Sequence, residues 1–274
     1  MDVKRWLLAA LIGGVVASAP PPAPDAALPR GPSGLAQALT RTRVELRAEI
    51  RAWITSGGAG NGGPPRRVAL EVLYEQRIER ELAARPRLAR ATITRLPPAL
   101  ASQVRDEVRS QRELGRLARP SSLAAVRVGR PLPADVLLRH YREAERRFHV
   151  RWQVLAALNF VESAFNKLRN RSAAGAQGPM QFLPSTWRSY GLGGNVHDPH
   201  DAILGAANYL HAAGAPRSYR RALFAYNPSP LYVDAVLRYA RQIERDRRSY
   251  FDYYSRQVFV HTPAGVRRVT GPRR

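Results

Sequence analysis

Apolar positions in the first half of the chain recur at the spacing of amphipathic helices. Within residues 33–54, apolar side chains interleave with Arg and Glu, namely Leu35, Leu39, Val44, Leu46, Ile50 and Trp53. Similar patterns return over residues 66–84, 97–118 and 134–148. Because a period near 3.6 residues places such positions on one face of a helix, the pattern predicts a helical N-terminal region over residues 33–147.

The pattern changes at residues 150–161, which are followed by Glu162. In a helix over these residues, apolar side chains would cover almost every face. A helix without a polar face is buried in a core. Loss of solvation raises the pKa of a carboxyl in such surroundings, and a carboxylic acid still protonated near neutral pH can donate a proton to a leaving oxygen. The alternative is a buried Glu162 paired with Arg169 or Arg171.

A loop and two later polar side chains are candidates to accompany Glu162. Residues 172–183 are rich in small residues, and their glycines permit tight turns and close approach of a ligand. Gln181 offers both a donor and an acceptor, which suits an amide or a sugar hydroxyl. Tyr226 and Asn227 close a further predicted helix; core packing of the ring and a helix C-cap are the alternatives for this pair.

The two ends of the chain have patterns of their own. Residues 1–19 have a basic start, a short apolar run and small residues, typical of a signal peptide or, if uncleaved, a membrane anchor. Residues 20–32 predict an extended, mobile Pro/Ala linker.

Residues 230–247 predict a last helix. Residues 247–274 predict a basic aromatic tail with a β-hairpin, which either packs against the rest of the chain or presents a sugar-binding edge.

Composition narrows the chemistry and the partners. The 274-residue chain has no Cys, which excludes disulfides, Cys-ligated zinc and a thiol nucleophile. Its 44 basic and 21 acidic residues give a net charge of +23, which predicts an anionic partner without choosing among nucleic acid, membrane and acidic polymer. An exported protein meets envelope polymers far more often than nucleic acid. Residues 148–243 carry 10 basic but only 4 acidic side chains, which draws attention to Glu162.

Six short motifs follow one another in order around this glutamate. They are Glu162-Ser163, SAAGAQGPMQF (172–182), PSTW (184–187), DPHDA (198–202), AANYL (206–210) and AYN (225–227). Their order and spacing resemble the catalytic domain of soluble lytic transglycosylases, a lysozyme-like family acting on peptidoglycan, especially the exported actinobacterial forms. The resemblance lies in residues 148–243, and it implies a lysozyme-like domain, which we place at residues 148–246. Together with the helical patterns before it and the hairpin after it, the sequence predicts an all-α protein with an N-terminal helical extension and a small C-terminal hairpin.

The resemblance also implies a mechanism, in which the β-1,4 bond between N-acetylmuramic acid and N-acetylglucosamine is cleaved without water. One glutamate, matched by Glu162, protonates the glycosidic oxygen and then takes the proton of the sugar's 6-hydroxyl, leaving a 1,6-anhydro end. The residues matched to substrate binding are Ser163, the cleft-lining Ser172 and Gln181, the wall residue Met180, and the pair facing the glutamate, Tyr226 and Asn227. This scheme requires no cofactor and differs from the two-carboxylate glycosidases.

Departures from the family pattern bear on the cleft edge and on metals. Residues 228–230 (PSP) fix the backbone where relatives often carry other residues. Residues 191–196 (GLGGNV) lack the carboxylates of a calcium loop. Residues 197–201 (HDPHD) could be interpreted as a metal cluster, but we interpret them as a loop in which Asp201 caps a helix that begins at Ala202. The prediction is therefore that no metal binds.

The sequence thus predicts an exported or anchored peptidoglycan lytic transglycosylase that acts as a monomer on glycan strands. Anionic wall polymers are a further expected partner, nucleic acid is not, and the membrane is contacted only through residues 1–19 if they stay uncleaved. Three alternatives stay open: a lysozyme-type muramidase in which Glu162 activates water, a non-catalytic wall-binding protein on the same fold, and a basic nucleic-acid binder.

Overall fold

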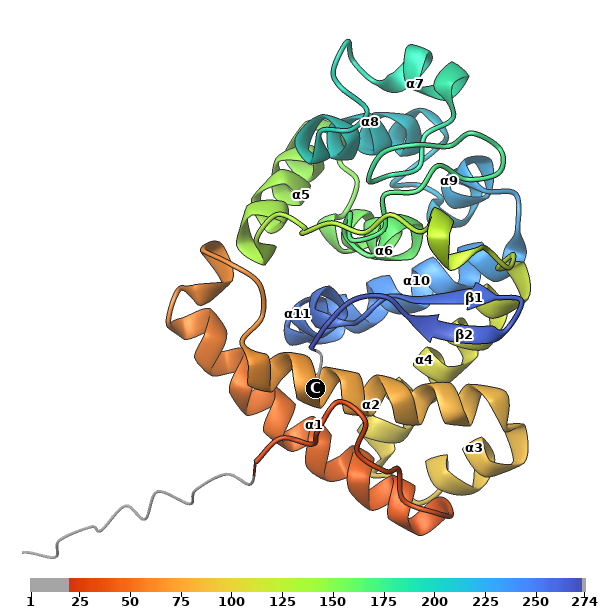
Figure 1. Cartoon of the computed structure of the whole chain (residues 1–274). Coiled ribbons are helices and arrows are strands. Elements are labelled where there is room, and N and C mark those ends of the chain that lie inside the picture. The colour runs from red at the N-terminus through yellow and green to blue at the C-terminus, as the bar shows by residue number, and fades with distance from the viewer. Residues whose placement is uncertain (1–19, 273–274) are drawn as a thin grey trace, which may run out of the picture.

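The computed structural model describes residues 20–272, so the predicted signal or anchor segment, residues 1–19, lies outside the described residues. The described part of the chain forms eleven α-helices, two short 3-10 helices and one two-stranded antiparallel hairpin (Figure 1). The predicted all-α class with a small C-terminal hairpin is confirmed. Each helix within residues 20–272 is too short or too polar to span a bilayer.

The N-terminal region consists of four α-helices, drawn in the red to yellow part of Figure 1. They are α1 (Pro32–Thr55), α2 (Arg66–Ala84), α3 (Pro86–Ile93) and α4 (Pro98–Leu117), with the 3-10 turns η1 (Gly58–Gly60) and η2 (Leu123–Ala125). The pattern did not predict α3. It also placed Val44 on the apolar face of α1, but Val44 is 67% exposed. The neighbouring Arg43 is buried in its place, because it meets acidic partners inside the protein.

The second half of the chain contains the remaining elements. They are α5 (Ala134–Phe148), α6 (Trp152–Ser163), α7 (Pro184–Tyr190), α8 (Pro199–Ala212), α9 (Tyr219–Tyr226), α10 (Pro230–Arg245), α11 (Arg248–Ser255), β1 (Phe259–Thr262) and β2 (Gly265–Arg268). In the hairpin, Phe259 pairs with Arg268 and Thr262 with Gly265. The two strands lie beside α10 and above α2 in Figure 1, so the C-terminal tail returns to the N-terminal helices.

Helix α10 joins the two halves, because it packs against α4 on one side and α6 on the other. The larger of two hydrophobic clusters runs from Leu46 in α1 through α6 to Tyr254 in α11. The N-terminal helices therefore belong to one continuous body with the second half. Residues 20–32 were predicted as a mobile linker, but Pro32 begins α1. Ala26 packs on the second apolar cluster, and its carbonyl accepts a hydrogen bond from Arg77 at 2.7 Å.

The aromatic residues of the tail form part of the core. Tyr250, Phe251, Tyr253 and Tyr254 lie on α11 and are fully buried. The hydroxyl of Tyr250 donates to the carbonyl of Ala134 at 2.7 Å. Because these rings are enclosed by protein, they do not provide a sugar-binding edge, and the packing alternative describes this part of the tail.

A cluster of charged side chains is buried where α11 meets α1, α2 and α4. We call it the buried charge network, and its members are Arg43, Glu75, Glu79, Glu107, Asp252 and Arg256, each 5% exposed or less. Arg256 donates to both carboxylate oxygens of Glu79, at 2.7 and 3.0 Å. Arg43 donates to Asp252 at 2.9 Å and also to Glu75. The network therefore ties the C-terminal tail to the N-terminal helices.

Candidate active site

Glu162 lies in the last turn of α6, directly before a sharp reversal of the chain. Helix α6 ends at Ser163. Left-handed backbone angles follow at three consecutive residues, Ala164, Phe165 and Asn166 (φ 50°, 63° and 66°). This conformation costs a non-glycine residue about 1–2 kcal/mol. Complete burial of Phe165 and a hydrogen bond from the Asn166 amide to the Ser163 hydroxyl, at 2.9 Å, offset that cost. The reversal ends the helix and leaves Glu162 on the wall of a cleft.

The carboxylate of Glu162 has one hydrogen-bond partner that sequence reasoning missed. The hydroxyl of Tyr232, in the first turn of α10, donates to Glu162 Oε1. Burial raises the pKa of Glu162 to about 7, although the hydrogen bond from Tyr232 acts to lower it. Within the described residues no ion pair joins Glu162 to Arg169 or Arg171, and Arg169 instead donates to the carbonyl of Arg130 at 2.9 Å. The alternative of a buried ion pair is therefore wrong.

Two cavities meet at Glu162. The smaller, about 460 Å³, lies between α2, α4, α6, α10 and the hairpin, and its lining includes Arg80 and His261. The larger, about 700 Å³, lies beside the loops around residues 119–121 and 170–174. Among the described residues that line either cavity, Glu162 is the single carboxylate. The cleft thus extends to both sides of one proton-donating group.

The loop of residues 172–182 forms one wall of the larger cavity. Gly178 has φ 76°, and a Cβ there would lie 1.9 Å from the carbonyl oxygen of Val196, so only glycine fits. Gln181 donates to the carbonyls of Gly178 and Asn170 at 3.0 and 3.2 Å. Ser172 accepts from the amide of Ala176 at 3.0 Å. The structure thus places Ser172 and Gln181 on the same cavity wall as Glu162; their contact with substrate stays a prediction.

Two of the predicted substrate-binding side chains point into the protein. Ser163 is 2% exposed, and its hydroxyl donates to the carbonyl of Pro179 at 2.6 Å. Met180 is fully buried. The loop of residues 172–182 folds back over α6, and this encloses both side chains. Both residues hold the loop against α6. Ser163 also lines the smaller cavity next to Glu162, whereas Met180 is not among the residues that line either cavity. The part that these two residues take in substrate binding stays a prediction.

Tyr226 and Asn227 end α9 near the cleft. The hydroxyl of Tyr226 donates to the carbonyl of Met180 at 2.6 Å, so this side chain fixes the loop. Asn227 lines the smaller cavity together with Glu162, and it also occupies the C-cap position of α9. The two residues of the predicted pair therefore differ in their surroundings. Asn227 lines the cavity and is available to a ligand, whereas the Tyr226 hydroxyl is hydrogen-bonded within the protein.

The proline pair at the cleft edge explains how Tyr232 is placed. Ser229 is the N-cap of α10, its hydroxyl accepts from the amide of Tyr232 at 3.4 Å, and Pro230 occupies the first helical position. A Ser-Pro pair such as Ser229-Pro230 is typical of a helix start. The sequence therefore contained a local indication that Tyr232 lies in a first turn close to Asn227. The walls formed by α2, α4 and the hairpin had no such signal, because they come from segments distant in sequence.

The start of α8 also differs from the prediction. The helix begins at Pro199, and its N-cap is Asp198, which accepts from the amides of His200 and Asp201 at 2.8 and 3.1 Å. Proline fits the first helical position because it has no amide hydrogen that needs a partner there. Asp201 does not cap the helix. Its Oδ2 accepts from the amide of Asn195 at 2.8 Å and so closes the preceding loop.

Comparison with known proteins assigns the part of the chain that carries this site. Residues 139–248 match the family model described as the transglycosylase SLT domain. The match covers less than half of the chain, so it is this segment that is similar to a transglycosylase SLT domain. The predicted resemblance is thereby confirmed, and the matched range includes Glu162, Tyr232 and both residues at the end of α9.

A curated relative of this chain supports the same family assignment. The membrane-bound lytic murein transglycosylase F of Thiobacillus denitrificans is 28% identical over 141 residues, which are 48% of this chain and 29% of the relative. The chain therefore spans less than a third of the length of that relative. No solved structure matches.

Proposed function

We propose that this protein is a peptidoglycan lytic transglycosylase in which Glu162 is both the acid and the base. The observation that carries the proposal is a lone carboxylate where two cavities meet, with its pKa raised by burial to about 7. A group with a pKa near the working pH is suited to give and to take a proton in one cycle. The SLT match and the lytic murein transglycosylase relative support the reaction class.

In the proposed reaction, protonated Glu162 gives its proton to the glycosidic oxygen as the bond from that oxygen to the anomeric carbon breaks. The resulting carboxylate takes the proton of the sugar's 6-hydroxyl, whose oxygen forms the new bond to the anomeric carbon. No water is consumed and Glu162 returns to its starting state. The Tyr232 hydroxyl, which donates to Glu162 Oε1, stabilises the ionised carboxylate between the two proton transfers.

The remaining lining suits an anionic glycan. Arg80 lies on the wall of the smaller cavity, and Arg119 and Arg171 lie on that of the larger. The lactyl and peptide carboxylates of peptidoglycan are the matching charges. A cavity on each side of Glu162 gives room for sugars on both sides of the cleaved bond. The net charge of +23 supports further attraction to anionic wall polymers, and residues 1–19 support export or anchoring in the envelope.

A product analysis tests this proposal and separates its enzymatic competitor. The purified full chain is incubated with peptidoglycan in water enriched in oxygen-18, and the released muropeptides are weighed by mass spectrometry. Anhydro ends without the label are the expected product. Labelled reducing ends would overturn the transglycosylase proposal in favour of a muramidase in which Glu162 activates water.

Two matched variants test the role of the carboxylate. Glu162→Gln removes the proton donor, whereas Glu244→Gln makes the same change on an exposed residue paired with Arg151. Loss of product in the first variant alone supports the proposal. If the wild type and Glu162→Gln bind sedimented peptidoglycan equally and neither releases product, the protein is a wall-binding protein on the same fold.

A further inference from the structure

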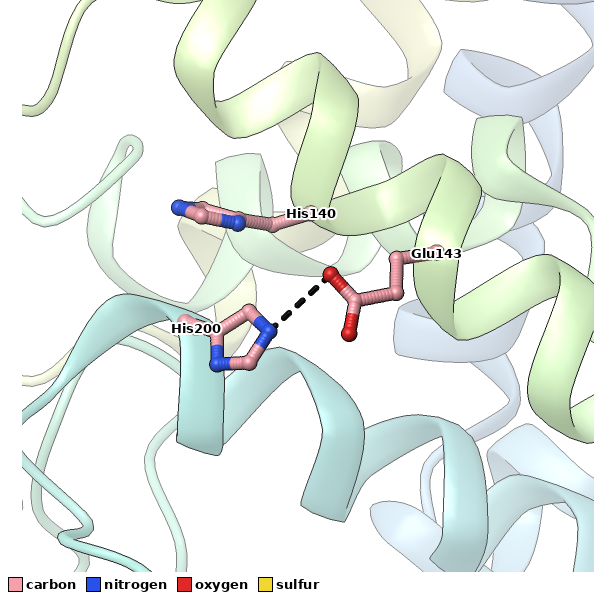
Figure 2. Close-up of side chains that lie close together, drawn as sticks. All are labelled: His140, Glu143 and His200. Carbon is pink, nitrogen blue, oxygen red and sulfur yellow. Dashed lines mark hydrogen bonds and ion pairs between the residues drawn. The ribbon is translucent and has the colours of Figure 1, made fainter.

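Three side chains from α5 and α8 converge outside the cleft (Figure 2). His140 and Glu143 are three residues apart on α5 and so share one face of that helix. His200 lies in the first turn of α8. Each offers one ligand atom, and these atoms all lie within 4.8 Å of one another. His200 Nε2 is 3.0 Å from Glu143 Oε2, and the two imidazole rings meet edge to face with centroids 4.8 Å apart.

The orientation of His200 is set by the start of its helix. Its Nδ1 lies 3.4 Å from Asp201 Oδ1, while the other oxygen of Asp201 accepts from the amide of Asn195. Nδ1 therefore faces a carboxylate and Nε2 faces Glu143. A histidine that binds a metal through one ring nitrogen usually donates the hydrogen on the other to a carboxylate or carbonyl. His200 has that arrangement.

The donor set selects a class of ion. Two imidazole nitrogens and one carboxylate oxygen are ligands that zinc and similar transition metals accept, whereas calcium and magnesium prefer oxygen alone. Atoms bound at about 2.0–2.2 Å around a tetrahedral zinc lie about 3.4 Å apart, so the 3.0 Å approach of His200 and Glu143 is close to the required spacing. All three side chains are partly exposed, which leaves an entry path and room for a water as fourth ligand.

We propose that His140, Glu143 and His200 form a binding site for one zinc-type divalent cation. Such an ion would join α5 to the start of α8, two helices separated by about fifty residues of chain. The loop before α8 carries Val196, whose carbonyl lies close to the backbone of Gly178, within the loop of residues 172–182. The cation would therefore brace the loop on which one wall of the cleft rests. The prediction of no metal rested on residues 191–196 and 197–201 and did not consider His140 and Glu143 on α5.

Calorimetric titration of the full chain, prepared without a histidine tag, with zinc chloride tests the site. We expect one bound zinc per chain, no comparable binding of calcium, and a rise in melting temperature of about 5 °C at saturation. His140→Ala and His200→Ala should each weaken zinc binding at least about tenfold. His211→Ala is the matched control, because His211 is an exposed histidine on α8 outside the cluster.

Each outcome decides for or against the site. Equal weakening in His211→Ala would show adventitious binding by surface histidines and overturn the proposal. Absence of zinc binding by the wild type would do the same and leave Glu143 and His200 as an ordinary hydrogen-bonded pair. Because all of these histidines are partly or fully exposed, the variants should fold, and a circular dichroism spectrum checks that they do.

Discussion

Two regions of this protein shield carboxylates from water, and the surroundings of these carboxylates differ. In the buried charge network, Glu79 and Glu107 are fully enclosed and lie beside Arg43 and Arg256. In the cleft, Glu162 adjoins two cavities and has the Tyr232 hydroxyl as its hydrogen-bond partner. The first region stabilises the fold, whereas the second, in the proposed function, supplies the proton that is transferred.

The pKa values follow from that difference. Burial alone acts to raise the pKa of Glu107, but Arg256 and Arg43 lower it to about 2, so this group stays ionised. Burial raises the pKa of Glu75, in the same network, to about 8, and Arg43 only partly opposes this. Glu162 has burial without a cation and reaches about 7. Desolvation is common to both regions, and the placing of arginines decides which carboxyl keeps its proton.

The largest expected effect comes from removing the cleft carboxyl. Glu162→Gln should reduce the release of soluble muropeptides by about 10³-fold or more, because general acid–base catalysis supplies factors of this order. Turnover measured by chromatography of the products checks it, with Glu244→Gln as the control that should retain wild-type turnover. Undiminished turnover in Glu162→Gln would place the acid elsewhere and remove the contrast between the two regions.

The opposite experiment removes a cation from the buried charge network. Arg43→Ala should lower the free energy of unfolding by about 3–5 kcal/mol, because it leaves buried acids without their partner. Arg47→Ala, one turn further along α1 at an exposed ion pair with Asp246, should change it by less than about 1 kcal/mol. Denaturant titration of both variants measures the two values. Similar losses in the free energy of unfolding for the two variants would show that the buried ion pairs stabilise the protein no more than an exposed pair does.

A smaller effect is expected from the hydroxyl that contacts Glu162. Tyr232→Phe removes a hydrogen bond that favours the ionised carboxylate, so the pKa of Glu162 should rise further. The alkaline limb of the pH–activity profile should then move to higher pH, with turnover reduced about tenfold. Tyr219→Phe, whose hydroxyl accepts from the Arg151 amide away from the cleft, should leave the profile in place. An acid shift in Tyr232→Phe would contradict this account of the contact.

The smallest effect concerns the pH dependence of stability. Glu75 and Glu162 have folded pKa values of about 8 and 7 against 4.5 as the ordinary value, so the folded state binds more protons between these values. Their contribution to stability is complete below about pH 4.5 and is lost as pH rises through 7 to 8. Melting temperature should therefore fall from pH 5 to pH 8. In Glu162→Gln the melting temperature should fall less steeply with pH. An unchanged slope would show that the pKa of Glu162 is the same in the folded and unfolded states.

Much of the fold could be predicted because its helices have strong local signals. The pattern of residues 66–84 and 134–148 matches α2 and α5 to the residue, since both begin next to proline and have clear apolar faces. Helix α3 was missed because it is short. Val44 was misplaced because periodicity counts apolar residues only, and here the buried face of α1 includes Arg43, whose acidic partners lie on other helices.

In the candidate site, the sequence pointed to Glu162 through two signals together: a single acid after an apolar helix, and six motifs in the order typical of the family. It also identified the loop of residues 172–182 and the end of α9. Only the tertiary structure decided which of these side chains reach the cleft, that Tyr232 contacts Glu162, and that His140 and Glu143 meet His200. The physical reason is range: periodicity and helix capping act over a few residues, whereas cavity walls and ligand sets depend on how distant helices pack.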